Sequence, residues 1–259
     1  MIPRVLIIAG SDSGGGAGIQ ADIRTVTMLG GHAMTAITAI TAQNTLGVQA
    51  VHAVPADIVV AQMRSVLADL GVDAVKIGMI GSAATAHAVA DELDALDVPI
   101  VFDPVMVATS GSVLADADTI AAFDRLMRRA AIVTPNLPEL AALGGEAAVR
   151  ATGAAVLVKG GHGDGDVVED RLIAADGAET LWTHPRIDTR HSHGTGCTLA
   201  SGIATGLAAG LPLADAVGRA IAYVQAALAA APGLGAGHGP MGHALGRVPF
   251  DDWTATCPD

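Results

Sequence analysis

The pattern that decides the fold opens with residues 4–9, Arg-Val-Leu-Ile-Ile-Ala, and continues into residues 10–18, Gly-Ser-Asp-Ser-Gly-Gly-Gly-Ala-Gly. A short apolar run that ends at glycines predicts a β-strand and a turn, and the amphipathic residues after it predict a helix. This alternation recurs along the chain, which favours a doubly wound α/β fold. It predicts strands at 4–9, 33–41, 72–77, 99–103, 130–134 and 154–159 and helices at 17–29, 57–70, 82–96 and 116–128.

The strand at 99–103 lies in an almost continuously apolar run, Val98 to Phe102, which is typical of a parallel strand covered by helices on both faces. Residues 171–175 and 180–184 flank Asp176-Gly177, so they predict a small hairpin at the edge of the mostly parallel sheet. Two long Ala-rich helices are expected at 194–209 and 212–230. In the helix at 57–70, the 3.6-residue period predicts one buried stripe of Ile58, Met63, Val66, Leu67 and Leu70.

Composition narrows the class of protein. The chain has 259 residues, and 14 basic against 26 acidic side chains give a net charge of −12, which argues against nucleic acid and anionic membranes as partners. With 51% hydrophobic and 15% charged residues the chain must collapse, and without an internal repeat or linker we expect one domain over 1–259. No apolar run is long enough to span a bilayer, and two distant cysteines, Cys197 and Cys257, favour a reducing, cytoplasmic location.

The two lysines of the chain, Lys76 and Lys159, each close an apolar strand. Ligands of doubly wound folds bind beyond the carboxyl ends of the strands, so both lysines are expected at the ligand edge of the sheet. A lysine ammonium is a compact charge on a flexible stem and suits a moving phosphoryl group. An ordinary strand-end charge is the competing interpretation, more so for Lys76 than for Lys159, whose following glycines leave room for a ligand.

Polar residues that follow other strands suggest a cation site. Asn136 and Glu139, three apart, would place an amide beside a carboxylate, and Asp103 after its own strand could add a second carboxylate. Mg²⁺ keeps several waters and takes one or two such oxygens. Asn136 is also a good helix N-cap, with Pro138 and Glu139 in the first turn, and this structural role explains much of the same motif.

The segment 189–198, Thr-Arg-His-Ser-His-Gly-Thr-Gly-Cys-Thr, opens a long helix. Its Gly194-Thr195-Gly196 exposes backbone N–H groups at the positive end of the helix dipole, a nest for phosphate charge. Cys197 lies in the first turn, where a helix N-terminus lowers a thiol pKa from about 8.5. Two rival interpretations stay open: a zinc site of His191, His193 and Cys197, and covalent catalysis by Cys197 with His193 as its base.

The first glycine loop matches neither common nucleotide motif. A GxGxxG pattern that starts at Gly14 would need its third glycine at Ile19, and no Gly-Lys pair of a Walker A loop is present. This counts against a dinucleotide oxidoreductase, which remains an alternative of a different enzyme class.

Taken together, the motifs resemble the ribokinase-like superfamily and, within it, the hydroxymethylpyrimidine/phosphomethylpyrimidine kinases of thiamine biosynthesis. Each motif is only moderately specific, but their shared order over about residues 4–243 is highly specific. The matching strings are 9–22 (AGSDSGGGAGIQAD), 41–45 (TAQNT), 76–79 (KIGM), 103–106 (DPVM), 134–139 (TPNLPE), 159–162 (KGGH) and 193–198 (HGTGCT).

The resemblance implies a role for each matched position. Lys159, Asn136 and Thr195 would bind ATP, with Glu139 and Asp103 near Mg²⁺. Gly194, Thr195 and Gly196 would form an anion hole, and Cys197 would occupy the position of the general base. The pyrimidine pocket would be lined by Gly10, Asp22, Gln43, Met79 and Val107.

The resemblance also implies the reaction. ATP would phosphorylate 4-amino-5-hydroxymethyl-2-methylpyrimidine, and a second ATP would convert the monophosphate to the diphosphate. A pyridoxal or pyridoxine kinase of the same superfamily is the close alternative, and a non-catalytic pyrimidine sensor is a distant one. A homodimer is possible by analogy. The chain departs from the family at 144–153, where the usual crossover helix should be cut to a turn or two.

Overall fold

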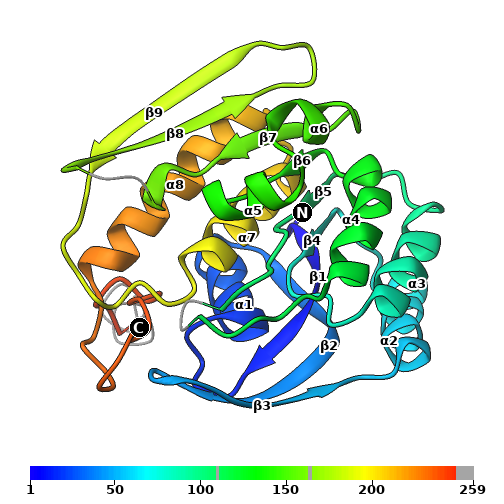
Figure 1. Ribbon diagram of the computed structural model, residues 1–259, viewed down its shortest axis with the longest axis horizontal. Coiled ribbons are helices and arrows are strands. Elements are labelled where there is room, and N and C mark those ends of the chain that lie inside the picture. The colour runs from blue at the N-terminus through cyan, green and yellow to red at the C-terminus, as the bar shows by residue number, and fades with distance from the viewer. Residues whose placement is uncertain (109–110, 163–164, 249–259) are drawn as a thin grey trace, which may run out of the picture.

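The computed structural model describes residues 1–108, 111–162 and 165–248, and a single sheet runs through its centre (Figure 1). In this part of the chain the sheet has nine strands in the order β3-β2-β1-β4-β5-β6-β7-β8-β9. The strands are β1 (Arg4–Asp12), β2 (His32–Asn44), β3 (Gly47–Ala53), β4 (Ala74–Ile77), β5 (Ile100–Phe102), β6 (Ile132–Val133), β7 (Ala155–Val158), β8 (Val167–Ile173) and β9 (Glu179–Pro185).

The six neighbouring strands β2-β1-β4-β5-β6-β7 pair in parallel, and antiparallel strands close both edges of the sheet. At one edge β3 pairs with β2, and at the other β8 and β9 form the expected hairpin. The hairpin is longer than the sequence predicted, and β3 was not predicted. Most side chains of β3 are exposed, so the strand lacks the apolar run by which the buried strands were found.

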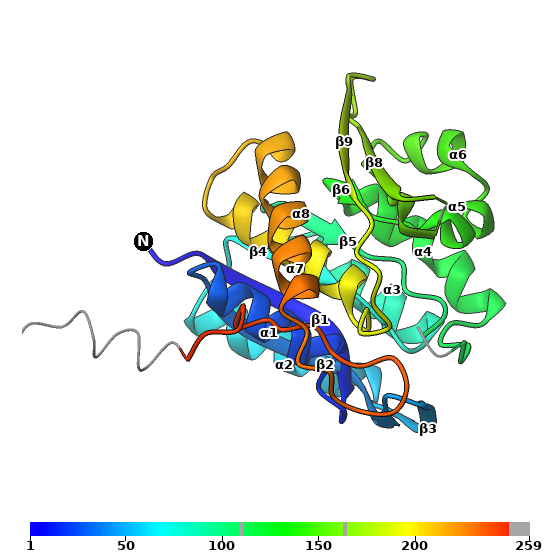
Figure 2. The same ribbon diagram turned by 90° about the vertical axis from the view of Figure 1, so that its left-hand side faces the viewer.

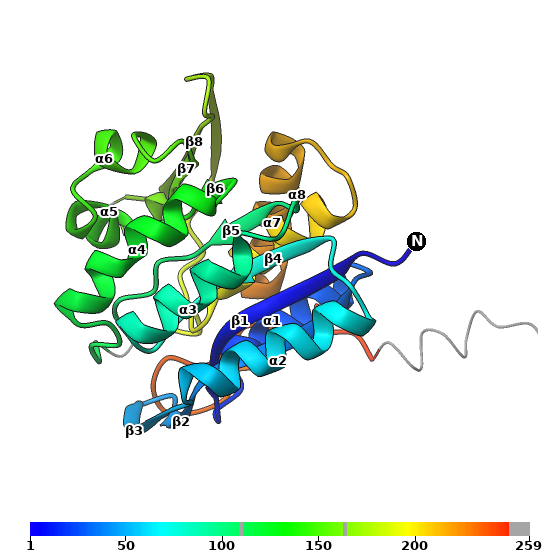
Figure 3. The same cartoon turned by 90° about the vertical axis from the view of Figure 1, so that its right-hand side faces the viewer.

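Helices cover both faces of the sheet, as the apolar strands predicted (Figures 2 and 3). Within β1, Leu6 and Ile8 pack into one core, and Val5 and Ile7 pack into the other. The first core includes residues of α2 (Ala56–Asp69), α3 (Ala83–Leu93), α4 (Ala117–Arg129) and α6 (Glu146–Arg150). The second includes residues of α1 (Gly18–Met28), α7 (Thr195–Ala208) and α8 (Leu213–Ala229). The remaining short elements are α5 (Leu137–Ala142) and η1 (Gly160–His162).

The predicted buried stripe of α2 is confirmed for Met63, with Val66 and Leu67 partly buried against the same core, and is wrong for Ile58 and Leu70. Val59 and Met63, one turn apart, are fully buried, whereas Ile58 and Leu70 are 50% and 45% exposed. The helix packs on β2, close to the sheet edge, and against α3, so only a narrow face of it is covered. The prediction for the 144–153 segment is confirmed, because the helix α6 there is five residues long.

None of the described helices combines the length and apolar character that a membrane crossing requires.

The strand order reverses beside β1, since β1 connects through α1 to β2 on one side and pairs with β4 on the other. In an open α/β sheet such a switch point leaves a crevice beyond the carboxyl ends of the strands. The loops after β1, β4, β5, β6 and β7 all leave the sheet at this edge and border the same hollow.

Candidate active site

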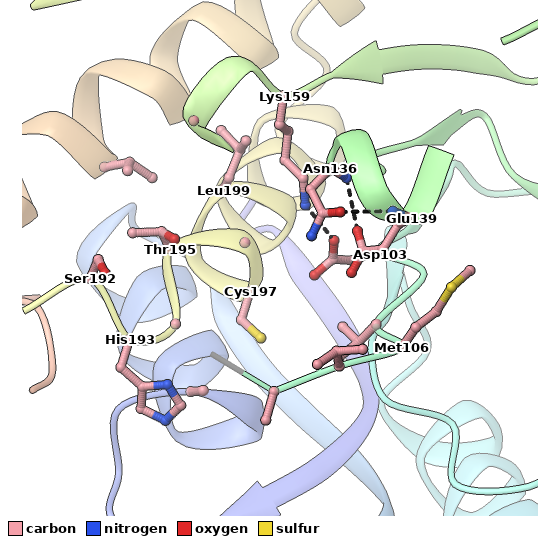
Figure 4. A pocket seen from close by; sticks show the side chains of 18 of the residues that line it. Asp103, Met106, Asn136, Glu139, Lys159, Ser192, His193, Thr195, Cys197 and Leu199 are labelled. Atoms are coloured by element: carbon pink, nitrogen blue, oxygen red, sulfur yellow. Dashed lines mark hydrogen bonds and ion pairs between the residues drawn. The ribbon is translucent and has the colours of Figure 1, made fainter. Parts of the chain in front are cut away.

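A cavity of about 1040 Å³ lies at this edge of the sheet. Its lining runs from the glycine loop after β1 to residues of β8 and β9 and includes the beginning of α7. Figure 4 shows Thr195 and Cys197 of α7 on the same side of the cavity as Lys159, Asp103 and Glu139. Most of the residues that the sequence singled out line this one cavity. They are Gly10, Gln43, Met79, Asp103, Val107, Asn136, Glu139, Lys159, Gly194, Thr195, Gly196 and Cys197.

Lys159 follows β7 and reaches past β6 to Asp103, which follows β5. Its Nζ lies 2.9 Å from Asp103 Oδ1, which also accepts a hydrogen bond of 3.1 Å from the hydroxyl of Thr134. Burial by itself would lower the pKa of Lys159, but Asp103 and Glu139 beside it raise the pKa above its usual value. The site therefore holds a permanent ammonium at the cavity wall, with 13% of the Lys159 side chain exposed.

Asn136 and Glu139 form a reciprocal cap at the start of α5. The side chain of Asn136 accepts from the Glu139 amide at 2.9 Å, and the Glu139 carboxylate accepts from the Asn136 amide at 2.8 Å. The structural role expected for this motif is thus present. Burial raises the pKa of Glu139, Asp103 raises it further, and Lys159 opposes both. Two neighbouring carboxylates with one lysine between them make a surplus of negative charge here.

The first residues of α7 approach this charged group. Gly194 has φ of +87°, and a Cβ there would overlap the carbonyl oxygen of Gly16. A Cβ on Gly196 would lie 3.3 Å from Lys159 Nζ and 3.5 Å from Asp103 Oδ2. The missing side chains thus bring the helix N-terminus and the ammonium to the same part of the cavity, where both attract an anion.

The expected low pKa of Cys197 is wrong. The dense surroundings of the thiol desolvate it and raise its pKa to about 11. Lys76 and the Gly18 amide act in the opposite direction, but burial dominates. A helix N-terminus favours a thiolate only where the sulfur stays solvated enough to keep its charge.

The placement expected for Asp22 and Lys76 is also wrong, since neither side chain lines the cavity. Both are fully buried below it, with Lys76 Nζ 2.8 Å from Asp22 Oδ2. Ser201, one turn after Cys197 on α7, donates a 2.7 Å hydrogen bond to Asp22 Oδ1. Burial would lower the pKa of Lys76, and the Asp22 carboxylate raises it instead. This closed cluster joins α1, β4 and α7 beneath the anion-binding turn.

The zinc interpretation finds no support. Among the residues that the structure describes, no three His, Cys, Asp or Glu side chains are arranged to hold a metal ion. His193 instead places its Nε2 2.9 Å from Asp12 Oδ2, so its partner is a carboxylate of the first glycine loop. Covalent catalysis by Cys197 is disfavoured because burial raises the thiol pKa to about 11, which leaves little of the nucleophilic thiolate.

Sequence reasoning did not identify Asp12 as part of the site. Its carboxylate accepts from the amides of Gly14, Gly16 and Ala17 at 2.8 to 3.0 Å, so it holds the whole glycine loop in shape. An aspartate two residues before a glycine is a known turn signal and could have drawn attention to it. Towards β8 and β9, the cavity is also lined by Asp170, His184 and Arg186, which no motif had indicated.

The chain matches known proteins along most of its length. The family described as phosphomethylpyrimidine kinase matches residues 12–242. The hydroxymethylpyrimidine/phosphomethylpyrimidine kinase of Rhizobium meliloti (strain 1021) is 51% identical over 257 residues, which cover 92% of this chain and 96% of that protein.

Solved structures with a similar fold are also kinases of small molecules. Bacillus subtilis pyridoxal kinase in an ADP complex has a TM-score of 0.87 at 29% identity, over 96% of this chain and 100% of that one. Phosphomethylpyrimidine kinase from Clostridium difficile 630 has a TM-score of 0.73 at 34% identity, over 87% of this chain and 98% of that one. The ribokinase-like fold inferred from the motifs is confirmed, and the chain belongs to the phosphomethylpyrimidine kinase family.

Proposed function

We propose that this protein is an ATP-dependent kinase which phosphorylates 4-amino-5-hydroxymethyl-2-methylpyrimidine and then its monophosphate, in thiamine biosynthesis. The observation that carries the proposal is the meeting of Lys159 with the start of α7 on one wall of the cavity. The family membership and the kinase names of the relatives support the same activity.

The residues divide the cavity into two ends. Gly10, Gln43 and Met79 border the end at the switch point, where Met79 packs so close to Gly10 that a Cβ would lie 3.0 Å from its Sδ. We assign the substrate ring to this end. Lys159, Asn136 and Thr195 border the end towards β7, which suits the phosphates of ATP. Val107 also lines the cavity, is 49% exposed and would contact the ring.

Phosphoryl transfer needs positioning and charge neutralisation more than covalent help. In the first step the substrate oxygen forms a bond to the γ-phosphorus, the bond from that phosphorus to the bridging oxygen breaks, and ADP leaves. Lys159 and the amides of residues 194–197 would hold the charge of the migrating group. The alcohol proton would pass to the thiolate form of Cys197, which is the minor form at neutral pH because burial raises the thiol pKa to about 11. The second step starts from an ionised phosphate and needs no base.

The residues present fit a Mg²⁺ ion. Asp103 and Glu139 are hard oxygen donors, and the Asp103 carboxylate helps raise the pKa of the buried Glu139, so a cation between them would relieve the repulsion. One or two carboxylates are what Mg²⁺ takes from a protein when phosphates supply the rest. Bound there, the ion would neutralise phosphate charge. Asp103 and Glu139 would hold it, and Asn136 would bind its waters or the nucleotide.

The decisive experiment measures ADP release with ATP and Mg²⁺ in the presence of the pyrimidine alcohol, and separately with its monophosphate. We expect turnover of both, with the diphosphate as the final product. Turnover of neither would overturn the proposal, and turnover of the monophosphate alone would remove the first step from it.

Pyridoxal phosphorylation is the second candidate. The TM-score of 0.87 with Bacillus subtilis pyridoxal kinase exceeds that of 0.73 with the Clostridium difficile phosphomethylpyrimidine kinase, which favours keeping it open. The 51% identity with a pyrimidine kinase favours the pyrimidine. Turnover of pyridoxal with none of either pyrimidine would establish the alternative. The homodimer and the cytoplasmic location stay predictions.

A further inference from the structure

The imidazole of His193 lies between the glycine loop after β1 and the end of the cavity that we assign to the pyrimidine ring. The residue is 8% exposed, its amide donates to the Gly239 carbonyl at 3.2 Å, and its backbone bridges to Pro240. A Cβ on Gly16 would lie 2.5 Å from its Cδ2, so the loop presses on the ring edge. The ring is therefore held in one orientation.

Asp12 determines which atom of this ring carries a proton. Its Oδ2 lies 2.9 Å from His193 Nε2, and its two oxygens already accept three backbone amides. Burial would raise the pKa of Asp12, but His193 and these amides lower it below its usual value. Because an ionised carboxylate only accepts, Nε2 of His193 must be protonated and donate.

The side-chain amide of Gln43 lies between this ring and Thr41. One end is 3.2 Å from His193 Nε2, and the other is 3.1 Å from Thr41 Oγ1. Thr41 has one hydroxyl proton for two contacts, at 2.9 Å to the Ser11 carbonyl and 3.1 Å to Gln43, and we assign the proton to the shorter one, which leaves Gln43 only a lone pair. With Nε2 of Gln43 towards the ring, donor would face donor, and Oε1 would face the Thr41 lone pair. Turning the amide by 180° lets its Nε2 donate to the Thr41 lone pair and lets its Oε1 share the one His193 Nε2 proton with Asp12 Oδ2 in a three-centre hydrogen bond.

We propose that His193 is a positioning residue that fixes the Gln43 amide with Oε1 towards the imidazole and Nε2 towards Thr41. One N–H and one lone pair of the amide then remain for a ligand. An aminopyrimidine offers the complementary pair, an amino donor and a ring-nitrogen acceptor. The inference rests on the proposed function for this ligand. His193 also directly precedes Gly194, so it links recognition of the ring to the anion-binding turn.

The test is a double-mutant cycle between His193 and Gln43, measured with ATP and each pyrimidine substrate. His193→Phe keeps a planar ring but removes the donor; we expect the KM of both pyrimidines to rise about tenfold, the loss of one hydrogen bond, with the KM of ATP within about twofold. His193→Gln places an N–H at a similar reach and should recover most of the loss. In a Gln43→Met background, His193→Phe should add less than about twofold.

Additive effects in the cycle, or an equal rise in the KM of ATP, would reduce His193 to a structural role and overturn the proposal. A substrate-free measurement covers variants that do not fold: ¹⁵N NMR of the wild-type histidine rings. We expect the His193 ring protonated at Nε2 near neutral pH, and a ring protonated only at Nδ1 would also overturn it. If the wild type turned over neither pyrimidine, the proposed function would fail, while the NMR result would still decide the geometry at His193.

Discussion

Two buried lysine–aspartate pairs lie within this molecule, and the difference between them separates scaffold from site. Lys76 and Asp22 are 2.8 Å apart with both side chains fully buried, and Ser201 completes the cluster. Lys159 and Asp103 are 2.9 Å apart, but the lysine keeps 13% of its side chain exposed at the cavity. Both lysines end or follow parallel strands of the same sheet. What differs is whether the ammonium has an open side on which to meet a ligand.

We call Lys159–Asp103 the open pair and Lys76–Asp22 the closed pair. The largest expected effect is on catalysis, when the open pair is changed. Lys159→Met removes the ammonium that faces the phosphates, and kcat/KM for both pyrimidine substrates should fall on the order of 10²–10³-fold. Unfolding free energy should fall less than at the fully buried Lys76–Asp22 pair, because Lys159 borders the cavity and its removal lets water reach Asp103, whose side chain is 3% exposed. ADP-release kinetics measure the expected fall in kcat/KM, and urea unfolding measures the change in stability. A fall in stability with activity retained would assign Lys159 to the scaffold.

The closed pair should show the opposite behaviour. Lys76→Met leaves the Asp22 carboxylate buried without its countercharge, and the unfolding free energy should drop by about 3–5 kcal/mol. Adding Asp22→Asn removes that charge and should recover a large part of the loss, since the oxygen of the introduced amide can still accept from Ser201. Urea unfolding of the two variants measures this. If the double variant were no more stable than Lys76→Met alone, the buried charge would not be the cause.

Cys197 is influenced by both pairs, and its pH dependence sharpens the comparison. A general base acts when deprotonated, and with a thiol pKa of about 11 the thiolate fraction rises about tenfold per pH unit between pH 7 and 9. The rate of alcohol phosphorylation should rise accordingly, and the monophosphate rate should stay flat, because that phosphate is ionised throughout. Cys197→Ser should slow the alcohol step about tenfold more than the monophosphate step. Equal losses in the two rates would argue against a base at this position.

The smallest effects are expected from two glycines that lie against the two ammonium groups. A Cβ would lie 2.8 Å from Lys76 Nζ at Gly78 and 3.3 Å from Lys159 Nζ at Gly196. Gly78→Ala must displace a fully paired lysine and should cost about 1–2 kcal/mol of stability with little change in KM for ATP. Gly196→Ala lies in a helix and should leave thermal stability unchanged or higher while raising that KM a few-fold. The reverse pattern in melting curves and kinetics would refute the division between the pairs.

The sequence predicted the central strands and helices within a few residues because the two buried faces of a parallel sheet demand long apolar runs. It missed β3, whose exposed side chains carry no such signal. It also placed most cavity residues correctly, since strand ends of a parallel sheet meet at one edge. The prediction failed for Lys76 and Asp22. A lysine near a strand end can point into the protein as readily as into the cavity, and its buried partner Asp22 decides the direction here.

Local sequence was enough to establish the fold class, the family motifs and the glycine turns, because these depend on short-range periodicity and on positions that tolerate no side chain. Packing in three dimensions settled which charges are sealed and which face the cavity, how far burial raises the pKa of Cys197, and that His193 meets Asp12 and Gln43. Those properties depend on groups separated by up to 181 positions along the chain. Solvation and hydrogen-bond partners of that kind exist only once distant segments have packed together.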